Sequence, residues 1–465
     1  MRTLAVKLAF AALALFCFRG PAAADAVDDF VTSQMQKRHI PGLSLAVVKD
    51  GKVVKMRGYG LASVELGVPA TEESVYQLAS MTKSFTATAV MMLVEEGKLG
   101  LDDKISQHLG GLRADWGEVT IRHLLTHTSG VPGEALPWSM DTVGKFYPRD
   151  EYLKLIVNAP LQFAPGTRFV YGNSDYYLLA AIIEKAGGKP YGEFLSERIF
   201  KPLGMTATRV NDPWEVVKNR VNAYGWDNKL VAPLTFHPSQ AVGSGNLLSS
   251  VSDLVKFEAA LGAGRLLKKS SLEQMWTPAR LKGGEETSYG LGWTVFNFRG
   301  HKIIGHGGNT IGFASQLSRF DDGTSVILLC NMFRGDDAPF KLSFRLAGFF
   351  IPDFAIPARP IVDTDPQFTE RLRQLLAGVA EGKVDAALFS PKLRGAFSQD
   401  AINAMKQEYA QFGPLKSLSL LESKADGANR LLMYRAAFEK KTLLYYIEAA
   451  GGGLIDDFGK EPEDE

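Results

Sequence analysis

The chain has 465 residues, of which 46% are hydrophobic and 22% charged, with a formal net charge of +1 at pH 7. This length exceeds one ordinary hydrophobic core, so we expect two domains, or one large domain with an appendage. Near-neutrality argues against a nucleic-acid surface or a polybasic membrane anchor, so we expect neither nucleic acid nor a stable membrane anchor as a partner.

Residues 1–24 have the pattern of a secretory signal peptide. Arg2 and Lys7 precede an apolar stretch over 8–18, which is too short to span a bilayer, and small residues lead up to Ala24. We expect cleavage after Ala24 and a periplasmic or secreted mature protein.

A hairpin is predicted near the start of the mature chain. A short helix over 28–37 precedes two strand-like runs at 43–48 and 53–56, and the Asp-Gly pair at 50–51 is typical of the turn between such strands. The next helix begins at Ser80 and ends near Gly97.

The middle of the chain, about 101–238, is predicted to be helical and rich in loops. Its clearest helix covers 176–186, and a further helix over 252–261 has Ser250 or Ser252 as its N-cap.

Three strand-like runs follow, at 292–298, 313–320 and 324–330. An early hairpin, a helical insertion and late strands together predict an α+β fold, an α/β sandwich with one antiparallel sheet flanked by helices and an inserted helical subdomain. We assign this domain to residues 25–352.

A cluster of prolines predicts a linker over 353–366, followed by a small α+β accessory domain over 367–465. The tail 460–465 is expected to be frayed. The elements predicted for this domain are helices at 368–381 and 400–412 and strands at 415–421, 430–438 and 441–447.

The motif Ser80-Met81-Thr82-Lys83 places a hydroxyl and an amine one helical turn apart. A serine nucleophile needs an adjacent base, and a neutral lysine at this spacing supplies one without histidine. Moving the pKa of a lysine from ~10.4 to roughly 7 requires about 4–5 kcal/mol, which partial burial and a second nearby cation could supply. On its own, Ser-x-x-Lys also describes an ordinary solvated helix start.

Two further segments offer complementary chemistry. Tyr171 and Asn173 provide a phenol that can relay a proton when nearby lysines favour its anion, and an amide that can contact both a substrate and Lys83. The segment from Gly305 to Thr310 precedes a predicted strand, and its glycines would let a substrate backbone lie against a sheet edge. Taken singly, this tyrosine also fits core packing, and the histidine of the second segment also fits a satisfied loop residue.

Together, Ser80-Met81-Thr82-Lys83, Tyr171-Gly172-Asn173 and His306-Gly307-Gly308 resemble the serine β-lactamase and penicillin-recognising family over roughly 27–350. The closest likeness is to its class C-like branch, with D-alanyl-D-alanine peptidases, D-aminopeptidases and β-lactamase-fold esterases. Supporting segments are Leu124–Gly130, Pro202–Met205 and Gly245–Ser250.

The resemblance implies a role for each matching residue. The catalytic set is Ser80 as acylated nucleophile, Lys83 as base or electrostatic partner, and Tyr171 as proton-transfer residue. The backbone N–H groups of Ser80 and Asn309 are implied to form the oxyanion hole. The substrate-binding set is Asn173, His306, Gly308 and Asn309.

One departure affects the substrate. Gly307 stands where the family often has threonine or serine, whose hydroxyl helps to hold the carboxylate of penicillins or D-alanyl termini. Loss of a charge-assisted hydrogen bond of roughly 1.5–3 kcal/mol would weaken such substrates ~10- to 100-fold. We therefore expect a peptidase, amidase or esterase acting on a small-molecule or peptide-like acyl substrate. The alternatives are a β-lactamase proper or a non-catalytic penicillin-recognising sensor or scaffold.

Other hydrolase classes fit less well. The Gly-x-Ser-x-Gly signature of α/β-hydrolases does not occur in the sequence. His123 and His127 have i, i+4 spacing, but the glutamate of a zinc-protease helix is missing between them, so we expect structural histidines and neither metal nor cofactor.

Overall fold

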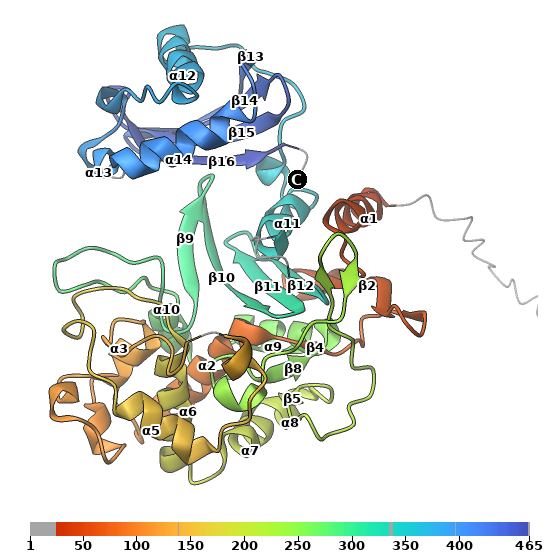
Figure 1. Cartoon of the computed structure of the whole chain (residues 1–465), viewed down its shortest axis with the longest axis vertical. Coiled ribbons are helices and arrows are strands. Elements are labelled where there is room, and N and C mark those ends of the chain that lie inside the picture. The colour runs from red at the N-terminus through yellow and green to blue at the C-terminus, as the bar shows by residue number, and fades with distance from the viewer. Residues whose placement is uncertain (1–24, 138, 334–337, 396, 464–465) are drawn as a thin grey trace, which may run out of the picture.

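The computed structural model describes residues 25–463 apart from 138, 334–337 and 396, so the predicted signal peptide lies outside the described residues. A seven-stranded antiparallel sheet forms the centre of the larger unit, in the order β3-β2-β1-β12-β11-β10-β9 (Figure 1). Its strands are β1 (Gly42–Lys49), β2 (Lys52–Ser63), β3 (Val68–Pro69), β9 (Thr294–Phe298), β10 (His301–Thr310), β11 (Phe313–Phe320) and β12 (Thr324–Cys330).

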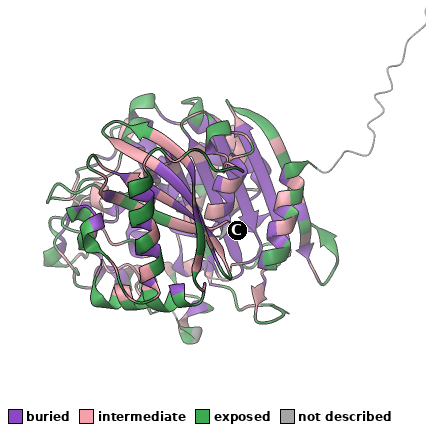
Figure 2. Cartoon of the chain, turned by 90° about the horizontal axis from the view of Figure 1, so that it is seen from above, coloured by how far each residue is buried: buried purple, intermediate pink, exposed green. Residues whose placement is uncertain are grey.

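The two ends of this unit meet in the middle of the sheet. β1 pairs antiparallel with β12, from Leu43 opposite Cys330 to Lys49 opposite Thr324. Both strands are buried almost throughout, and Figure 2 shows buried strands, in purple, in the interior of the molecule. The predicted early hairpin is confirmed, because Lys49 and Lys52 pair across the Asp50–Gly51 turn.

Helices cover both faces of the sheet, which confirms the predicted fold class. One face packs against α1 (Ala26–Arg38) and α11 (Ala338–Ala347), while the other packs against α2 (Thr82–Glu95), α6 (Asn173–Gly187) and α9 (Val251–Gly262). Helix α2 is buried on all sides from Thr82 to Leu93, where its polar residues lie buried among apolar ones in the core.

The inserted region is helical, as predicted, and also contains short strands that the sequence pattern did not indicate. Its other helices are α3 (Ile121–Leu125), α4 (Met140–Val143), α5 (Arg149–Val157), α7 (Tyr191–Leu195), α8 (Lys201–Leu203) and α10 (Lys269–Met275), with a π-helical turn at Ser196–Phe200 and 3₁₀ turns at Ala79–Met81, Ile105–Gln107, Ala114–Trp116 and Pro238–Gln240. Its short strands are β4 (Tyr76–Gln77), β5 (Arg209–Val210), β6 (Gly225–Trp226), β7 (Leu230–Val231) and β8 (Leu247–Ser249). Within the described part of the chain, no helix combines the length and apolarity needed to cross a membrane.

The segment Gly305–Thr310 differs from its prediction. It was expected to precede a strand, whereas it forms the second half of β10, which pairs with β11 from Ile303 to Thr310. Glycine is depleted in strands, which explains why the sequence pattern missed this one. A third late hairpin, β9–β10, therefore extends the sheet.

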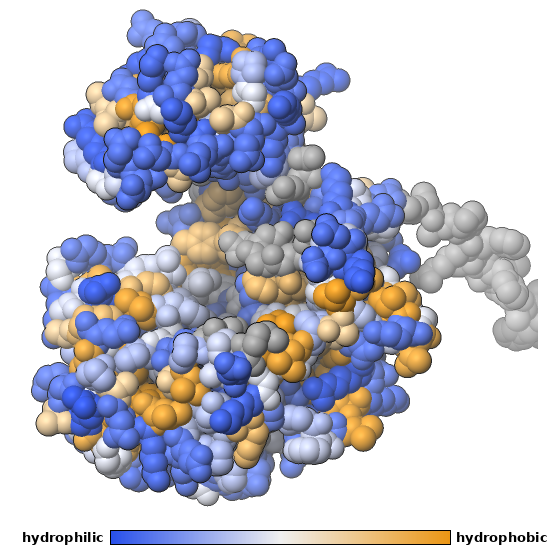
Figure 3. Space-filling view, viewed as in Figure 1, coloured by the Kyte–Doolittle hydropathy of each residue, from blue (hydrophilic) through white to orange (hydrophobic). Residues whose placement is uncertain are grey.

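The C-terminal part forms a separate small unit. A four-stranded antiparallel sheet, in the order β13-β14-β15-β16, packs against α12 and α14 around its own core. Figure 3 shows this unit at the top of the molecule, with a largely hydrophilic face. Its elements are α12 (Pro366–Val379), α13 (Pro391–Arg394), α14 (Gln399–Ala410), β13 (Leu415–Asp426), β14 (Asn429–Phe438), β15 (Thr442–Ala449) and β16 (Ile455–Pro462), with a 3₁₀ turn at Ala386–Leu388. The 3₁₀ turn at Pro352–Phe354 precedes this unit, and Phe354 packs in the core of the larger one.

The predicted fraying of the tail is wrong for its first residues. Lys460 to Pro462 belong to β16 and pair with β15, and the Lys460 ammonium also lies 2.6 Å from Glu408. The charged composition suggested a solvated end, but one face of this edge strand covers the small core.

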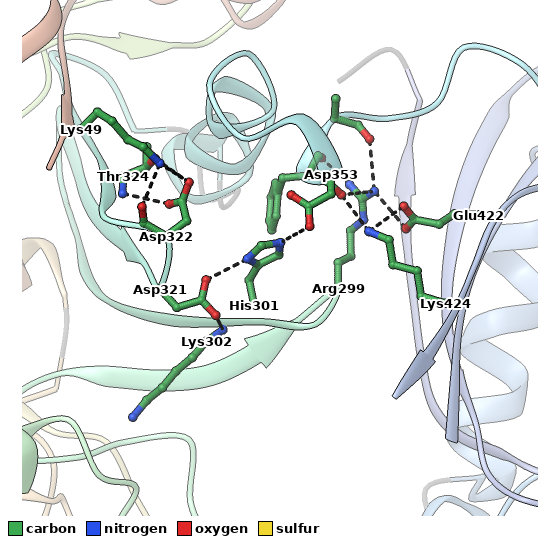
Figure 4. Close-up of polar contacts among 12 residues, drawn as sticks. Lys49, Arg299, His301, Lys302, Asp321, Asp322, Thr324, Asp353, Glu422 and Lys424 are labelled. Carbon is green, nitrogen blue, oxygen red and sulfur yellow. Dashed lines mark hydrogen bonds and ion pairs between the residues drawn. The ribbon is translucent and has the colours of Figure 1, made fainter. Parts of the chain in front are cut away.

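The β9–β10 hairpin joins the two units (Figure 4). At its tip, Arg299 donates to the backbone carbonyls of 353–355 and forms an ion pair of 3.1 Å with Glu422 on β13. His301 lies between Asp321 and Asp353, and Lys424 donates to the Asp353 carbonyl. The opposite end of the same hairpin contributes to the site described below.

Candidate active site

Ser80 lies on a tight turn at the start of the buried helix α2. The preceding residue, Ala79, has φ +48°, a left-handed conformation that costs a non-glycine residue roughly 1–2 kcal/mol. The turn continues as a 3₁₀ helix over Ala79–Met81 before α2 begins at Thr82. Strain of this kind is typical of functional sites, where the surrounding structure holds the residue in place.

Lys83 lies one turn beyond Ser80 and is completely buried. Its Nζ lies 3.1 Å from Ser80 Oγ, 2.8 Å from Asn173 Oδ1 and 3.0 Å from the carbonyl oxygen of Ser244. Burial lowers the pKa of Lys83 to about 7, against the opposing charges of Glu134 and Asp175. A fraction of the lysine is therefore neutral at physiological pH.

The physical cause of this low pKa differs in part from the prediction. Burial is complete instead of partial, and it is the cause that lowers the pKa. The second cation expected nearby is not among the charges that act on Lys83 in the described structure, where the two carboxylates raise its pKa instead. Desolvation thus lowers the pKa of Lys83 by more than the two nearby carboxylates raise it.

Tyr171 and Asn173 form one wall of the cleft above Lys83. The hydroxyl of Tyr171 hydrogen-bonds with Ser80, and the Lys83 ammonium lies 4.7 Å from the centre of the Tyr171 ring. Desolvation of the hydroxyl raises the pKa of Tyr171, although 42% of the residue's surface is exposed in the cleft. This shift runs against the phenolate that nearby lysines were expected to favour.

Glu134 completes this wall and was not predicted. Its Oε1 accepts a hydrogen bond of 2.7 Å from Asn173 Nδ2, so a single amide lies between the carboxylate and the Lys83 amine. The sequence offers no spacing signal for Glu134, because only the fold brings residue 134 beside residue 173.

The opposite wall is the open edge of β10. β9 pairs with β10 only as far as Gly305, opposite Thr294, whose hydroxyl donates to the Gly305 carbonyl. N–H and C=O groups of alternate residues in an antiparallel strand point to the same side. The backbone groups of Gly307 and Asn309 therefore face the edge where β9 has ended, although the Gly307 carbonyl already accepts from His306 Nδ1.

Gly308 allows this strand to approach Ser80. A Cβ atom at Gly308 would lie 2.0 Å from the Leu78 carbonyl oxygen and 2.8 Å from Ser80 N. Only glycine fits at this distance, and the close approach brings the backbone of β10 next to the Ser80 N–H.

His306 is buried and neutral. Its Nδ1 lies 2.6 Å from the carbonyl oxygen of Gly307, which can only accept, so Nδ1 carries the proton and Nε2 accepts from the Tyr289 hydroxyl at 2.8 Å. Burial lowers the pKa of His306 to about 3, and the charge of Lys83 acts in the same direction.

These residues enclose one cleft of about 540 Å³. Of the residues predicted for the site, Ser80, Tyr171, Asn173, His306 and Asn309 line it, Lys83 lies beneath it, and Gly308 sits against Ser80. The predicted residues thus come together around one serine, although their elements are far apart in the sequence. Within the described residues there is no group of three or more potential metal ligands.

A serine in contact with a buried lysine under an exposed sheet edge, in a sandwich of this topology, defines a penicillin-recognising type of serine hydrolase scaffold. Residues 27–347 match the Beta-lactamase family, and the chain belongs to this family. The family resemblance drawn from the motifs is therefore confirmed.

Three relatives illustrate this similarity. Penicillin-binding protein 4* of Bacillus subtilis is 31% identical over 355 residues, which cover 70% of this chain and 76% of that protein. The solved octameric penicillin-binding protein homologue from Pyrococcus abyssi is 25% identical with a TM-score of 0.62, over 93% of this chain and 95% of its own. The D-amino acid amidase from Ochrobactrum anthropi SV3, solved with D-phenylalanine, is 26% identical with a TM-score of 0.60, over 69% of this chain and 99% of its own.

Proposed function

We propose that this protein is an exported serine hydrolase that forms an acyl-enzyme on Ser80 and acts on amides or esters of amino acids. The observation that carries the proposal is the 3.1 Å contact between Ser80 Oγ and the buried Lys83 Nζ, whose pKa is lowered to about 7. This pairing supplies an activated nucleophile near neutral pH.

In the proposed acylation step, neutral Lys83 accepts the proton of the Ser80 hydroxyl while Oγ forms a bond to the substrate carbonyl carbon. The carbonyl oxygen becomes an oxyanion, which accepts hydrogen bonds from the N–H groups of Ser80 and Asn309. Tyr171 passes a proton from Lys83 to the leaving amine or alcohol as the bond from carbon to that group breaks. The enzyme is left acylated on Ser80, with neutral Lys83.

Deacylation repeats the same chemistry with water. Lys83 accepts a proton from the attacking water, a second tetrahedral intermediate forms, and the bond to Ser80 Oγ breaks as Oγ regains a proton. The net reaction consumes one water and releases a carboxylic acid and an amine or alcohol.

The charges around the cleft support an ammonium-bearing substrate. Glu134 lines the cleft as a carboxylate, His306 is neutral, and Gly307 lacks a hydroxyl for a substrate carboxylate. A free α-amino group next to the scissile carbonyl would reach Glu134 and gain a charge-assisted hydrogen bond. The amidase relative, whose structure holds D-phenylalanine, supports a D-amino acid amide as the first compound to test.

A matched substrate panel tests this function. We expect purified mature protein to hydrolyse D-phenylalanine amide, and to hydrolyse the N-acetylated amide roughly 10- to 100-fold less efficiently, since acetylation removes the charge. Ser80→Ala must abolish both activities. Equal rates on the two amides would overturn the ammonium subsite, while slow acylation by penicillin without release or amide turnover would favour the sensor function.

Export is tested separately by N-terminal sequencing of the protein secreted from cells that express the full chain. Cleavage after Ala24 would leave Asp25 as the first residue, where its side chain accepts from the Val27 N–H and caps α1. A mature N-terminus inside α1, or retention of the leader, would contradict the proposed signal peptide.

A further inference from the structure

The segment that follows α3 supports the wall of the cleft from behind. Between Thr126 and Gly133 it runs beside residues 162–174, and its carbonyl oxygens accept hydrogen bonds from several amides of that stretch. The two most relevant join Val170 N to His127 O at 2.9 Å and Asn173 N to Gly133 O at 2.7 Å. This segment therefore fixes the backbone positions on either side of Tyr171 and at Asn173.

His127 and Asp175 are the polar centre of this support. His127 Nδ1 lies 3.0 Å from Asp175 Oδ2 and 3.4 Å from the Gly172 amide nitrogen, while Asp175 Oδ1 accepts a hydrogen bond of 2.5 Å from Ser129 Oγ. The imidazole centre lies 4.4 Å from the centre of the Tyr171 ring. Helix α6 begins at Asn173, so Asp175 lies in the first turn of the helix that carries the Lys83 partner.

This arrangement is unfavourable for a protein core. Both side chains are almost completely inaccessible, His127 Nε2 has no hydrogen-bond partner among the described residues, and the His127 backbone has a left-handed φ of +57°. Replacing a buried polar pair by well-packed apolar residues is often neutral or stabilising. A polar cluster of this kind beside a reactive serine therefore indicates selection for activity.

We propose that His127 and Asp175 are positioning residues, which hold Tyr171 and Asn173 in register with Lys83 without touching substrate. This inference rests on the proposed function. A displacement of about 1 Å in a catalytic group can reduce a rate by roughly 100-fold, so the loss of this support acts on the chemical step.

The proposed role of the pair is positional; the charge of Asp175 acts on Lys83 separately and raises the pKa of that lysine. Burial lowers the pKa of His127 well below its usual value and raises the pKa of Asp175 well above its usual value. The titratable groups that face the pair are Lys83, Tyr171, Tyr176, Tyr289 and His306. Among them Lys83 has a pKa of about 7, so the pH profile of the enzyme should follow Lys83 and not the pair.

The test compares Asp175→Leu, an apolar replacement of similar size, with the conservative Asp175→Asn. Asp175→Leu is expected to lower kcat roughly 30- to 100-fold with KM within about 3-fold and an equal or higher Tm. Both variants remove the Asp175 charge that raises the pKa of Lys83, so both should move the pH midpoint to lower pH by the same amount. Asp175→Asn keeps an acceptor for Ser129 and a donor for His127, so it should restore kcat to within roughly 5-fold of wild type. Wild-type kcat in Asp175→Leu, or an equal loss in both variants, would overturn the proposal.

Asp253→Asn is the matched control, since Asp253 is also buried and accepts hydrogen bonds from Thr208 at a distance from the cleft. It should lower Tm with kcat nearly unchanged. If Asp175→Leu does not fold, the proposal is tested with Ser129→Ala, which removes the hydrogen-bond donor to Asp175. An unchanged kcat in Ser129→Ala would overturn the proposal.

Hydrogen exchange at the Gly172 amide tests the positioning role without depending on whether the protein is a serine hydrolase. The Gly172 amide should exchange roughly tenfold faster in Asp175→Leu, or in Ser129→Ala, than in wild type, because its acceptor is no longer held. If wild-type Ser80 does not react with a fluorophosphonate, the proposed function fails, while unchanged exchange of Gly172 refutes the positioning pair in either case.

Discussion

Substitution of Glu134 by glutamine removes one charge from the cleft and leaves the shape of the side chain unchanged. Glutamine is isosteric with the original residue, and its amide oxygen can still accept from Asn173 Nδ2. The Asn173 amide separates the carboxylate from the Lys83 amine through hydrogen bonds of 2.7 and 2.8 Å. A unit charge at a separation of ~7 Å is worth roughly 2 kcal/mol at an effective dielectric constant of about 20. Glu134 raises the pKa of Lys83, so its neutralisation should lower that pKa by roughly one unit once solvent in the cleft is considered.

The pH dependence of kcat/KM measures this effect directly. Neutral Lys83 is the proposed base, so activity should rise with pH through a midpoint near 7, and the Glu134→Gln midpoint should move to lower pH. The same variant should raise KM for D-phenylalanine amide roughly 10- to 100-fold and leave p-nitrophenyl acetate, which has no ammonium group, nearly unchanged. Glu118→Gln, the same substitution at an exposed position of this unit, is the control. A midpoint that stays in place or moves to higher pH would refute the electrostatic reasoning.

Three further predictions concern stability and backbone packing. Lys83→Met should stabilise the fold relative to wild type, and most at low pH. Folding lowers the pKa of Lys83 from 10.5 to about 7, so between these pH values the unfolded wild-type chain binds one more proton than the folded chain. Wild type therefore loses stability as pH falls from 10.5 to 7. Denaturant unfolding of both proteins at pH 6 and pH 10 checks this, and a difference independent of pH would contradict it. Gly308→Ala should abolish labelling of Ser80, because the new methyl group collides with the Leu78 carbonyl at 2.0 Å; a crystal structure with Ser80 undisplaced and full labelling would count against this packing. Arg299→Ala should destabilise the protein by roughly 1–3 kcal/mol, since the carbonyls of 353–355 lose a charged donor while Glu422 retains its ion pair with Lys424. A Tm equal to that of wild type would show that these contacts do not hold the two units together.

Local patterns in the sequence were sufficient to predict the parts of the site that depend on neighbours in the chain. The spacing of Ser80 and Lys83 fixes their contact through helical geometry alone, and the Asp50–Gly51 turn fixes the first hairpin. The family motifs added Tyr171 and Asn173, whose places depend on the fold, and the structure brings both to the same cleft.

The features that the sequence did not predict depend on long-range contacts. Glu134 reaches the cleft only because its loop is tied to residues 162–174, and no periodicity marks it. The degree of burial at Lys83, and with it the cause of the low pKa, depends on helices packed around α2 from distant parts of the chain. β10 was not recognised as a strand because its glycines lower the β propensity of the segment. One of these glycines, Gly308, is also what allows the strand to approach Ser80.

The most direct test follows inactivation by a fluorophosphonate and locates the adduct by mass spectrometry. A covalently competent serine beside a neutral amine should take up one phosphonyl group per chain, on the peptide that contains Ser80, with hydrolysis of D-phenylalanine amide lost in proportion to the modification. Turnover that persists after Ser80 is fully modified, or in Ser80→Ala, would contradict the mechanism.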